Sequence, residues 1–423
     1  MQKYNVTIRL VNIKIMKKIV AFSTYCTKGG AGKAALKFCQ NLNDLGFDVE
    51  LYTTELNFKK FDCTVNHNYV KKNKVTWKII DSIIIRTLSI TKRGLFSSAF
   101  IGSISNKDID KIIQSADIVF IFWINDGFLS LSNIKHIINS NKKVFWRLSD
   151  EWPISNGFHY AENINTDSIN YVSRKLLFQL ERYKILLCSS NNLTFIAPSK
   201  WIYNITINKS KFFEKTKYIP TTVDLDIFNP NKREMGRNIF SFINSVKYVL
   251  FGSISSDRDP RKGFDLLISS LNHLPKIINN KHLIKIVVFG NQDANKLDNI
   301  PYEVIYIGNI DKNNDLANLY AACDVFVAPA REENLANTCL EACSSGLPLV
   351  AFDIGGMPDV IKHSKNGYLT TPFNCAEFAC NIASALNNRD KLGRYSRLLA
   401  FNNFSIDIFN KEIKKIGELN DSY

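Results

Sequence analysis

The sequence predicts an α/β protein with two domains, each built around a mostly parallel sheet. Apolar runs typical of strands alternate with helix-like stretches along nearly the whole chain, which is the pattern of parallel α/β layers. The alternation breaks once, at 221–231 (TTVDLDIFNPN), where turn residues gather as in a linker. With 423 residues, 45% of them hydrophobic, the chain is long enough for two or three domains with cores of their own.

The first domain is placed at 16–228, after an N-terminal extension at 1–15. An apolar strand at 18–22 leads into a glycine turn, followed by helical periodicity at 34–45 and a strand at 48–52. Residues 55–100 show no regular pattern. Further elements are predicted as strands at 118–122, 144–146 and 194–197, a helix at 131–139, and a helix from Trp201 that Ser199 is suited to cap.

The second domain is placed at 229–395, with the same alternation starting afresh. Strands are predicted at 248–251, 285–289, 324–327 and 349–352, with helices at 264–271 and 336–345. Two Rossmann-like domains that face each other across a cleft are the simplest arrangement of these elements.

The glycine turn, TKGGAGKAA at 27–35, admits two interpretations. In a P-loop, backbone N–H groups cradle phosphates, a lysine reaches the outer phosphates and a Ser/Thr hydroxyl holds Mg²⁺. Here Lys33 is followed by Ala34, which has no oxygen for a metal, and Thr27 stands where that loop has its first glycine. The turn therefore fits a P-loop ATPase poorly, but this alternative stays open on the turn alone.

A second segment, 328–359 (APAREENLANTCLEACSSGLPLVAFDIGGMPD), carries two carboxylates around a predicted helix start. Glu333 and Glu341 are eight positions apart, or about 12 Å along a helix, which is too far for a paired acid and base. That spacing suits two groups that hold different ends of an extended ligand. Free N–H groups at the helix start would attract an anion, so a nucleotide sugar fits the layout.

The E-x7-E pattern, with the GLP and AFDIGG that follow it, resembles the nucleotide-sugar half of family 4 retaining glycosyltransferases of GT-B fold. The phrase ENLANTCLEA resembles the branch that builds bacterial surface polysaccharides. Three more stretches resemble the family's glycine turn, acceptor-side motif and diphosphate loop, in the family's order: GGAG at 29–32, FWRLSDEWP at 145–153 continuing to GFHY at 157–160, and DRDPRKGF at 257–264. The resemblance also implies that 396–423 form helices crossing back onto the first domain.

On the donor side, the resemblance implies that Glu341 holds the ribose hydroxyls and Glu333 the hydroxyls of the donor sugar. Lys262 would neutralise the diphosphate together with Arg258 or Arg261. The implied donor-binding residues are Gly29, Gly30, Arg258, Arg261, Lys262, Glu333, Asn334, Leu335, Ala336 and Glu341.

On the acceptor side, the resemblance places Asp150 at the reaction centre, so that Asp150, Glu333 and Lys262 form the expected catalytic set. Ser149, Trp152 and His159 are the acceptor-side candidates. The family often has histidine where this chain has Ser149, and a serine hydroxyl cannot act as an imidazole does. The role of that position is therefore expected to differ here.

The implied reaction moves a hexose from a nucleotide diphosphate to an acceptor hydroxyl with retention of the anomeric configuration. The leaving phosphate would take the acceptor proton, so no separate base is required. No metal and no cofactor are expected beyond the nucleotide-sugar co-substrate, and the pairs Asp224/Asp226 and Asp257/Asp259 are interpreted as turn residues. The open alternatives are a P-loop ATPase, a non-catalytic GT-B protein that only binds nucleotide sugars, and a sugar-nucleotide epimerase.

The charge is uneven, since residues 1–230 carry 32 Lys/Arg against 18 Asp/Glu within a net charge of +15. A basic half suggests an acidic partner, and we expect a glycan or lipid-linked acceptor and an anionic membrane surface, but no nucleic acid. The nine cysteines contain no CxxC pair and indicate a reducing compartment. No apolar run approaches the ~20 residues of a membrane span. A cytoplasmic enzyme, peripheral at the inner face of the membrane, is the resulting prediction.

Overall fold

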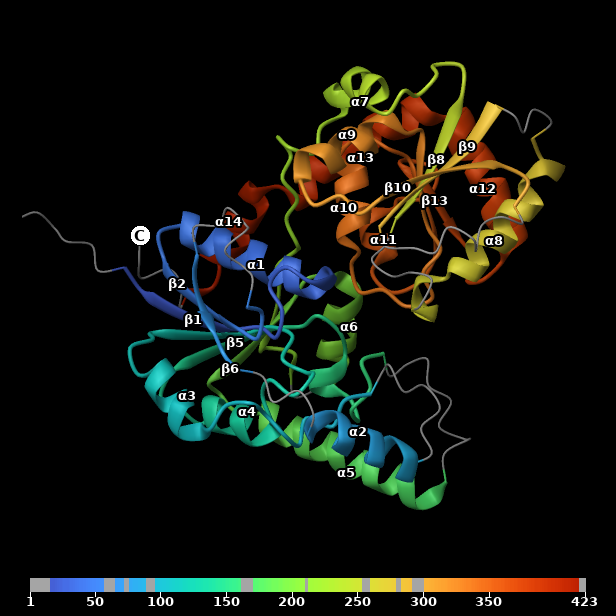
Figure 1. Ribbon diagram of the computed structural model, residues 1–423. Helices are drawn as coiled ribbons and strands as arrows, with labels where there is room; N and C mark the ends of the chain where they lie inside the picture. The colour runs from blue at the N-terminus through green and yellow to red at the C-terminus, as the bar shows by residue number, and fades with distance from the viewer. Residues whose placement is uncertain are drawn as a thin grey trace, which may run out of the picture.

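The computed structural model describes residues 16–56, 65–71, 76–88, 96–160, 170–209, 212–252, 259–278, 283–290 and 300–417. Two α/β domains lie next to each other, with the N-terminal one drawn in blue and green and the C-terminal one in yellow to red (Figure 1). All the strand pairs of both sheets run parallel. The predicted class, two Rossmann-like domains of GT-B type, is confirmed.

The first sheet has seven strands in the order β3-β2-β1-β4-β5-β6-β7. Its interior strand β1 is apolar, and Ile19 to Phe22 are fully buried. The order reverses between β1 and β4, which is the point where open α/β sheets bind ligands. The strands are β1 (Lys18–Phe22), β2 (Asp48–Thr53), β3 (Asn66–Tyr69), β4 (Ile118–Ile121), β5 (Lys143–Arg147), β6 (Leu193–Ala197) and β7 (Thr216–Tyr218).

Helices cover both faces of this sheet. One face packs against α3 (Asn106–Ile113), α4 (Leu131–Ile138), α5 (Tyr171–Cys188) and α6 (Lys200–Asn208). The other packs against α1 (Gly29–Asp44). Ser199 caps α6, accepting a hydrogen bond from the Ile202 N–H at 3.2 Å.

Two features differ from the sequence analysis. Helix α1 begins at Gly29 rather than Ala34, so the glycines form its first turn, where N–H groups lack helical partners and glycine costs little. The stretch 55–100, interpreted as irregular, contains β3 and α2 (Thr76–Thr87). The polar sequence of β3, NHNY, lacks the apolar pattern of a strand because β3 lies at the sheet edge, with no residue of it fully buried.

The second sheet has six strands in the order β10-β9-β8-β11-β12-β13, and its order reverses between β8 and β11. The strands are β8 (Lys247–Gly252), β9 (Ile284–Phe289), β10 (Glu303–Gly308), β11 (Val325–Ala328), β12 (Leu349–Phe352) and β13 (Gly367–Thr370). The helices are α7 (Arg233–Ile239), α8 (Phe264–His273), α9 (Asn313–Ala322), α10 (Asn337–Ser344), α11 (Met357–Val360), α12 (Cys375–Asn387) and α13 (Arg389–Phe404).

The chain returns to the first domain through α14 (Ile406–Lys414), which lies against it in Figure 1. Phe409 and Ile413 are buried in the core beside α1, and the rings of Phe409 and Phe38 meet edge to face at 5.0 Å. Because α13 is one continuous helix, residue 396 lies inside an element of the second domain. The return therefore starts after Phe404, at the break before α14.

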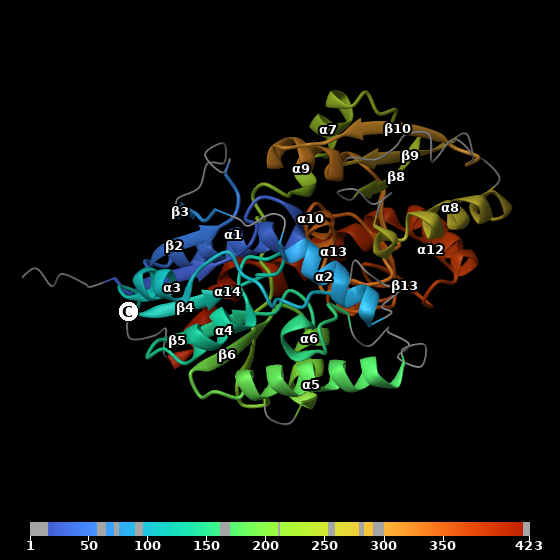
Figure 2. The ribbon, with the colours of Figure 1, turned by 60° about the horizontal axis from the view of Figure 1, so that its bottom comes forward.

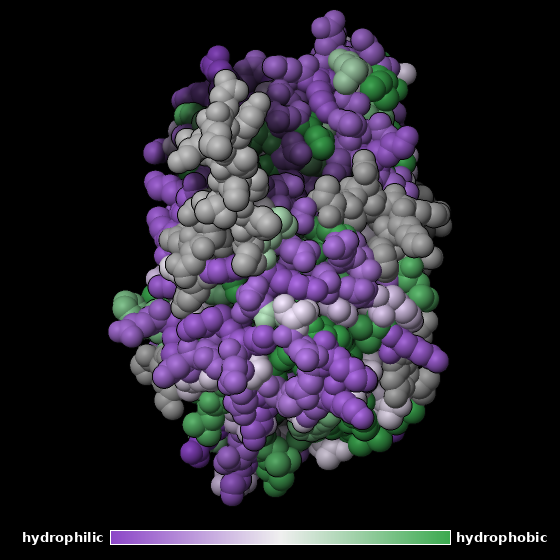
Figure 3. Space-filling view, turned by 90° about the vertical axis from the view of Figure 1, so that its left-hand side faces the viewer, coloured by the Kyte–Doolittle hydropathy of each residue, from purple (hydrophilic) through white to green (hydrophobic). Residues whose placement is uncertain are grey.

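Within the described residues, no helix combines the length and the apolar character required to cross a membrane. Hydrophilic residues predominate on the face of the molecule shown in Figure 3.

Candidate active site

A cleft of about 1220 Å³ lies between the two domains. This volume exceeds the ~300–1,000 Å³ of a typical small-molecule site, so the cleft has room for two substrates. It is bounded by the N-terminus of α1, which follows β1, and by the N-terminus of α10, which follows β11. Both helices start at the switch point of their sheet, so the parallel fold itself brings the two helix ends together.

The first turn of α1 presents free amides to this cleft. Gly29, Gly30 and Lys33 line it, and no side chain caps the helix. A Cβ on Gly29 or Gly30 would meet no protein atom within 4 Å, and Gly29 has a φ of +68° that favours glycine. The space in front of both glycines therefore remains available to a ligand.

The loop before α1 is organised differently from a P-loop. The N–H groups of Cys26 and Thr27 both donate to one oxygen of Glu55, each at 2.7 Å. Amides that hold a protein carboxylate cannot at the same time cradle a phosphate. This arrangement disfavours the ATPase alternative on geometric grounds, in addition to the alanine that follows Lys33.

The second helix start carries the two acidic side chains singled out by their spacing. Glu333 and Glu341 both line the cleft, Glu333 from the loop before α10 and Glu341 from within the helix. No side chain caps α10, so its first N–H groups are open between them. Asn334, Leu335 and Ala336 line the cleft along the same segment.

Glu341 lies deep in the cleft, where the Tyr320 hydroxyl donates to its Oε2 at 3.0 Å. Burial raises the pKa of Glu341 to about 7, although the hydrogen bond from Tyr320 and the charge of Lys33 act in the opposite direction. The carboxyl group therefore titrates near neutral pH. Its deprotonated form offers an acceptor to a ligand hydroxyl.

Lys262 and Glu333, both in the second domain, form an ion pair that lines the cleft, with Lys262 Nζ 2.7 Å from Glu333 Oε2. Both side chains are partly exposed to the cleft, so a ligand can reach them. Arg261 also lines the cleft but is held by Asp259, with Nη2 to Oδ2 at 2.7 Å and Nε to Oδ1 at 3.0 Å. Of these two cations, Lys262 can therefore exchange its partner for an incoming phosphate more easily. Arg258 and Asp257 lie outside the described residues.

Close backbone packing fixes these groups in place. A Cβ on Gly356 would lie 1.7 Å from the carbonyl oxygen of Asn334, and one on Gly355 would lie 1.8 Å from that of Glu333. A Cβ on Gly263 would likewise lie 1.8 Å from the carbonyl oxygen of Pro329. The loop that carries Glu333 thus rests on backbone that only glycine permits.

On the opposite wall, Asp150 and His159 form a buried pair. His159 Nδ1 lies 2.7 Å from Asp150 Oδ2, and its Nε2 lies 3.0 Å from Ser97 Oγ. The indole N–H of Trp123 also donates to Asp150 Oδ2, at 3.2 Å. Asp150, His159 and Ser97 all line the cleft, so the carboxylate orients an imidazole there.

The remaining acceptor-side candidates lie in different surroundings. Ser149 lines the cleft and its buried hydroxyl has no hydrogen-bond partner among the described residues. Trp152 is buried below the cleft wall, where its ring faces Lys184 Nζ at 3.7 Å and its indole N–H donates to the Ser97 carbonyl at 2.8 Å. The contacts of Trp152 therefore support the wall behind the Asp150–His159 pair rather than the cleft surface.

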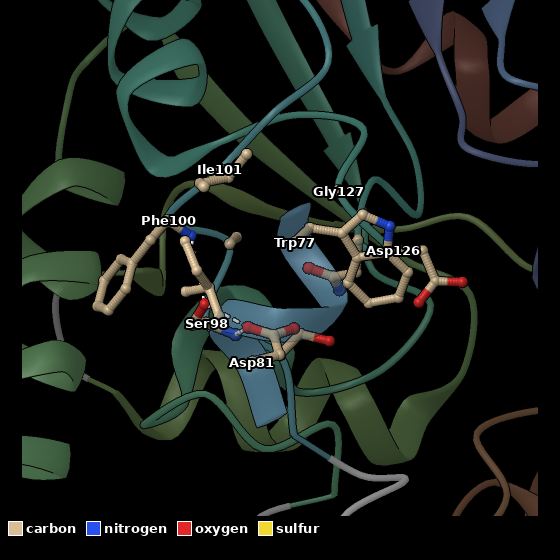
Figure 4. A pocket seen from close by; sticks show the side chains of 11 residues that line it. Trp77, Asp81, Ser98, Phe100, Ile101, Asp126 and Gly127 are labelled. Atoms are coloured by element: carbon tan, nitrogen blue, oxygen red, sulfur yellow. Dashed lines mark hydrogen bonds between the residues drawn. The ribbon is translucent and has the colours of Figure 1, made fainter. Parts of the chain in front are cut away.

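A group of side chains that the sequence analysis did not single out extends this wall. Trp77 lies between Asp81 and Asp126 beside a small pocket, while Phe100 points away (Figure 4). Asp81 accepts hydrogen bonds from the Ser98 hydroxyl and from the Ser98 N–H at 3.2 Å, and its pKa is raised by burial. The stretch 55–100 gave no periodic signal, so nothing in the sequence pointed to α2 as part of the cleft.

This wall of the cleft, which we call the acceptor wall after its predicted role, is thus rich in aromatic rings and carboxylates. Besides the residues above, Tyr25 and Trp123 stack at 5.8 Å between ring centroids, and the Tyr25 hydroxyl donates to Asp126 at 2.8 Å. Flat apolar rings with interspersed acceptors suit a ligand that is hydroxylated on its edges and apolar on its faces. Such a wall disfavours a densely anionic ligand.

Direct contacts between the domains close the cleft at its base. The Asn334 side chain donates to the carbonyls of Leu148 and Ser149, at 3.2 and 2.9 Å, and accepts from the Ser199 hydroxyl at 2.6 Å. Asn337 donates to the Gly30 carbonyl at 3.1 Å. Residues 333–337, which we call the donor loop after their predicted role, therefore touch both the glycine turn and the Ser149–Asp150 segment of the first domain.

Among the described residues, no three His, Cys, Asp or Glu side chains group as metal ligands would. Asp224 Oδ1 instead accepts the backbone N–H groups of Asp226 and Ile227, as in a turn, and Asp259 holds Arg261.

Comparison with known proteins finds glycosyltransferases among the similar sequences and the same fold among the solved structures. Residues 246–398 match the family described as glycosyl transferases group 1. An uncharacterized glycosyltransferase of Haemophilus influenzae is 24% identical over 91% of this chain and 96% of its own length. Spore coat protein SA of Bacillus subtilis is 29% identical over 55% of this chain and 67% of its own. The Anabaena HepE structure in complex with UDP-glucose covers 95% of this chain and 99% of its own, with a TM-score of 0.65 and 17% identity.

Proposed function

From the premise that this chain is a glycosyltransferase of GT-B fold, we propose that it is a retaining enzyme of family 4. In this proposal it moves a sugar from a nucleotide-diphosphate sugar to an acceptor hydroxyl. The acceptor is a glycan or a lipid-linked glycan of bacterial surface polysaccharide or glycolipid assembly. The reaction takes place on the cytoplasmic side, at the inner face of an anionic membrane.

One observation carries the proposal: Glu333, Lys262 and Glu341 line one cleft around the uncapped start of α10. A nucleotide sugar has hydroxyls at both ends and a diphosphate between them. Carboxylates at the two ends accept hydrogen bonds from the hydroxyls, while a lysine and free helix amides face the phosphates.

The proposed donor binding starts with an exchange of partners. In the unliganded protein Lys262 is paired with Glu333 at 2.7 Å. The diphosphate attracts Lys262, and the sugar hydroxyls then replace the lysine as partners of Glu333. The facing amides at the start of α1 supply further N–H groups for the phosphates.

In the transfer step, the bond between the sugar and the diphosphate breaks as negative charge grows on the leaving phosphate. Lys262 and the two helix starts stabilise that charge, which lowers the barrier more than it tightens the ground state. The leaving phosphate oxygen takes the proton of the acceptor hydroxyl, and that hydroxyl attacks the same face of the sugar. Asp150 holds the His159 ring on the opposite wall of the cleft, where the pair orients the acceptor.

The acceptor assignment is supported by the aromatic and acidic wall around Trp77, Trp123 and Asp126. A terminal sugar fits rings and carboxylates better than a bare phosphate does. The solved Anabaena relative holds UDP-glucose, which is a donor of the proposed class.

The test is a thermal-shift series with UDP-, GDP- and ADP-sugars. One nucleotide class is expected to raise the melting temperature, and Glu341→Ala is expected to abolish most of that increase by removing the ribose acceptor. As a control, Glu303→Ala alters a carboxylate that is 62% exposed and paired with Lys285 outside the cleft. No shift with any of the donors, or an equal shift in Glu341→Ala, would contradict the donor assignment. A radiolabelled product with a new glycosidic bond would then separate transfer from epimerisation or binding alone.

The affinity for the donor is expected to depend on pH through Glu341. Because the pKa of this carboxyl group is about 7, it is mostly protonated at pH 6 and mostly deprotonated at pH 8. Only the deprotonated form offers both oxygens to the ribose hydroxyls, so the dissociation constant measured by calorimetry should fall as pH rises through this window. Glu341→Gln should bind more weakly at pH 8 and show a flat profile; a profile with the wild-type slope would assign the titration to another group.

A further inference from the structure

The solvent side of α5 has an unusual composition. Six of the 23 large hydrophobic side chains that remain exposed among the described residues belong to this one helix, with exposed fractions of 41–72%. They are Tyr171, Val172, Leu176, Phe178, Tyr183 and Leu186. Single exposed apolar residues are common on soluble proteins, but a group of six on 18 residues is not.

Four of these side chains form a stripe along one side of the helix, which also includes the exposed polar residue Gln179. At 100° per residue, Val172, Leu176, Tyr183 and Leu186 fall within an arc of about 80° of the helix surface. The opposite side of α5 packs into the protein through Leu177, Lys184 and Cys188. The helix lies along the bottom of the first domain in both views, with its outer side uncovered by any labelled element (Figures 1 and 2).

The exposed charges on α5 all have one sign. Arg174, Lys175 and Arg182 are exposed, and Arg182 lies over the ring of Phe178 at 5.9 Å. The single carboxylate of the helix, Glu181, is only partly exposed and is paired with Lys209. The outer side of α5 therefore combines an apolar stripe with basic side chains and no free acid.

We propose that α5 docks this enzyme on a lipid bilayer with anionic headgroups, lying in the plane of the interface. A helix with an apolar stripe flanked by Lys and Arg binds at the boundary between headgroups and acyl chains. The charges argue against the alternative of a second copy, because a two-fold contact between α5 helices would bring Lys175 and Arg182 near the same residues of the partner. The inference adds a docking element to the proposed function, since it locates the membrane that holds a lipid-linked acceptor.

The position of α5 relates this surface to the cleft. Leu177 of α5 shares a hydrophobic cluster with Ile85 and Leu88, at the end of α2 and just after it. The N-terminal half of α2 lines the acceptor side of the cleft through Trp77 and Asp81. One shared cluster therefore joins the docking helix to the acceptor wall. An acceptor that extends from the bilayer would reach the cleft along this side of the first domain.

The test uses the full chain and co-sedimentation with vesicles of equal parts phosphatidylglycerol and phosphatidylcholine at low salt. Wild type should bind these vesicles and should bind pure phosphatidylcholine only weakly. Lys175→Glu/Arg182→Glu should lower the partition coefficient about 30-fold or more, since each basic residue near an anionic surface contributes about fivefold. Leu176→Ser/Leu186→Ser should lower it about tenfold or more through lost apolar burial.

Matched controls use exposed side chains of the second domain: Met235→Ser/Ile239→Ser for the apolar pair and Lys391→Glu/Arg394→Glu for the basic pair. Both controls should bind vesicles as wild type does, and all variants should keep the wild-type melting temperature and donor-induced shift. The proposal is overturned if wild type ignores anionic vesicles, if the controls lose as much binding as the α5 variants, or if the α5 variants instead dissociate a dimer. If the protein binds vesicles but no donor raises its melting temperature, the docking proposal stands and the donor assignment is rejected.

Discussion

Replacement of Lys262 by alanine is expected to lower the rate of sugar transfer by about 10²–10³-fold, because such losses follow when one preorganised charge at a developing anion is removed. Lys262 is the cleft cation whose present partner, Glu333, lies on the donor loop itself, whereas Arg261 is tied to Asp259 by two hydrogen bonds. Since charge on the diphosphate grows as the sugar leaves, kcat should fall more than the KM for the donor rises. Steady-state kinetics with a saturating acceptor measure both quantities.

Lys285→Ala serves as the matched control, because this lysine is paired with Glu303 outside the cleft. It should keep wild-type kinetics. Lys262→Arg should recover part of the rate, since the charge is kept but the reach and shape of the head group differ. Transfer at the wild-type rate by Lys262→Ala would remove Lys262 from the catalytic set and leave Arg261 and the helix amides as the stabilising groups.

Replacement of Gly356 by alanine is expected to abolish donor binding and to lower the free energy of unfolding by about 1–3 kcal/mol, as overpacking does elsewhere. The added Cβ would lie 1.7 Å from the Asn334 carbonyl oxygen, which is backbone and cannot rotate away. The loop that carries Glu333 must then move. The same displacement would break the hydrogen bonds from the Asn334 side chain to Leu148 and Ser149. Denaturant unfolding and the donor thermal shift measure the two effects.

Gly417→Ala is the corresponding control, since its Cβ would meet no atom within 4 Å. It should change neither stability nor donor binding by a measurable amount. If Gly356→Ala bound the donor normally, the loop would be more compliant than its close packing indicates, and Glu333 would not depend on a fixed backbone.

Much of the donor side could be predicted because its residues are close in sequence. Glu333 lies in the loop before α10 and Glu341 lies inside this helix, so their spacing of eight positions around a helix start was visible in the sequence. Their distance in space depends on the course of the loop. The glycines at 29, 30, 355 and 356 were visible as turns next to apolar strands. The partners of these groups could not be predicted in the same way: Lys262 meets Glu333 across 71 positions, and Asn334 meets Ser149 across 185.

Most of the acceptor wall, in contrast, could not be predicted from the sequence, because it is built from segments that are far apart along the chain. Asp150 and His159 are near in sequence, but the chain from Ser97 to Asp126 and the helix around Trp77 complete the wall from distant segments. The polar edge strand β3 has no apolar repeat, and the stretch around it was interpreted as irregular, so the contribution of α2 was missed. Glu55, which holds the Cys26 and Thr27 amides and so distinguishes this glycine turn from a P-loop, comes from the same stretch.

The two parallel sheets, the presence of a helix after β1 and after β11, and the acidic pair at the start of α10 could be predicted from the sequence alone, because repeat lengths and turn residues act over a few positions. The start of α1 was placed five residues too late. Only the tertiary structure decided which helix start faces which, that Lys262 and Glu333 meet, that Asp150 orients His159, and that an apolar and basic side of α5 is left uncovered. The first of these outcomes depends on how the two domains pack against each other, and the others depend on packing within one domain. Such packing joins residues that are far apart along the chain, and no local pattern of side chains encodes it.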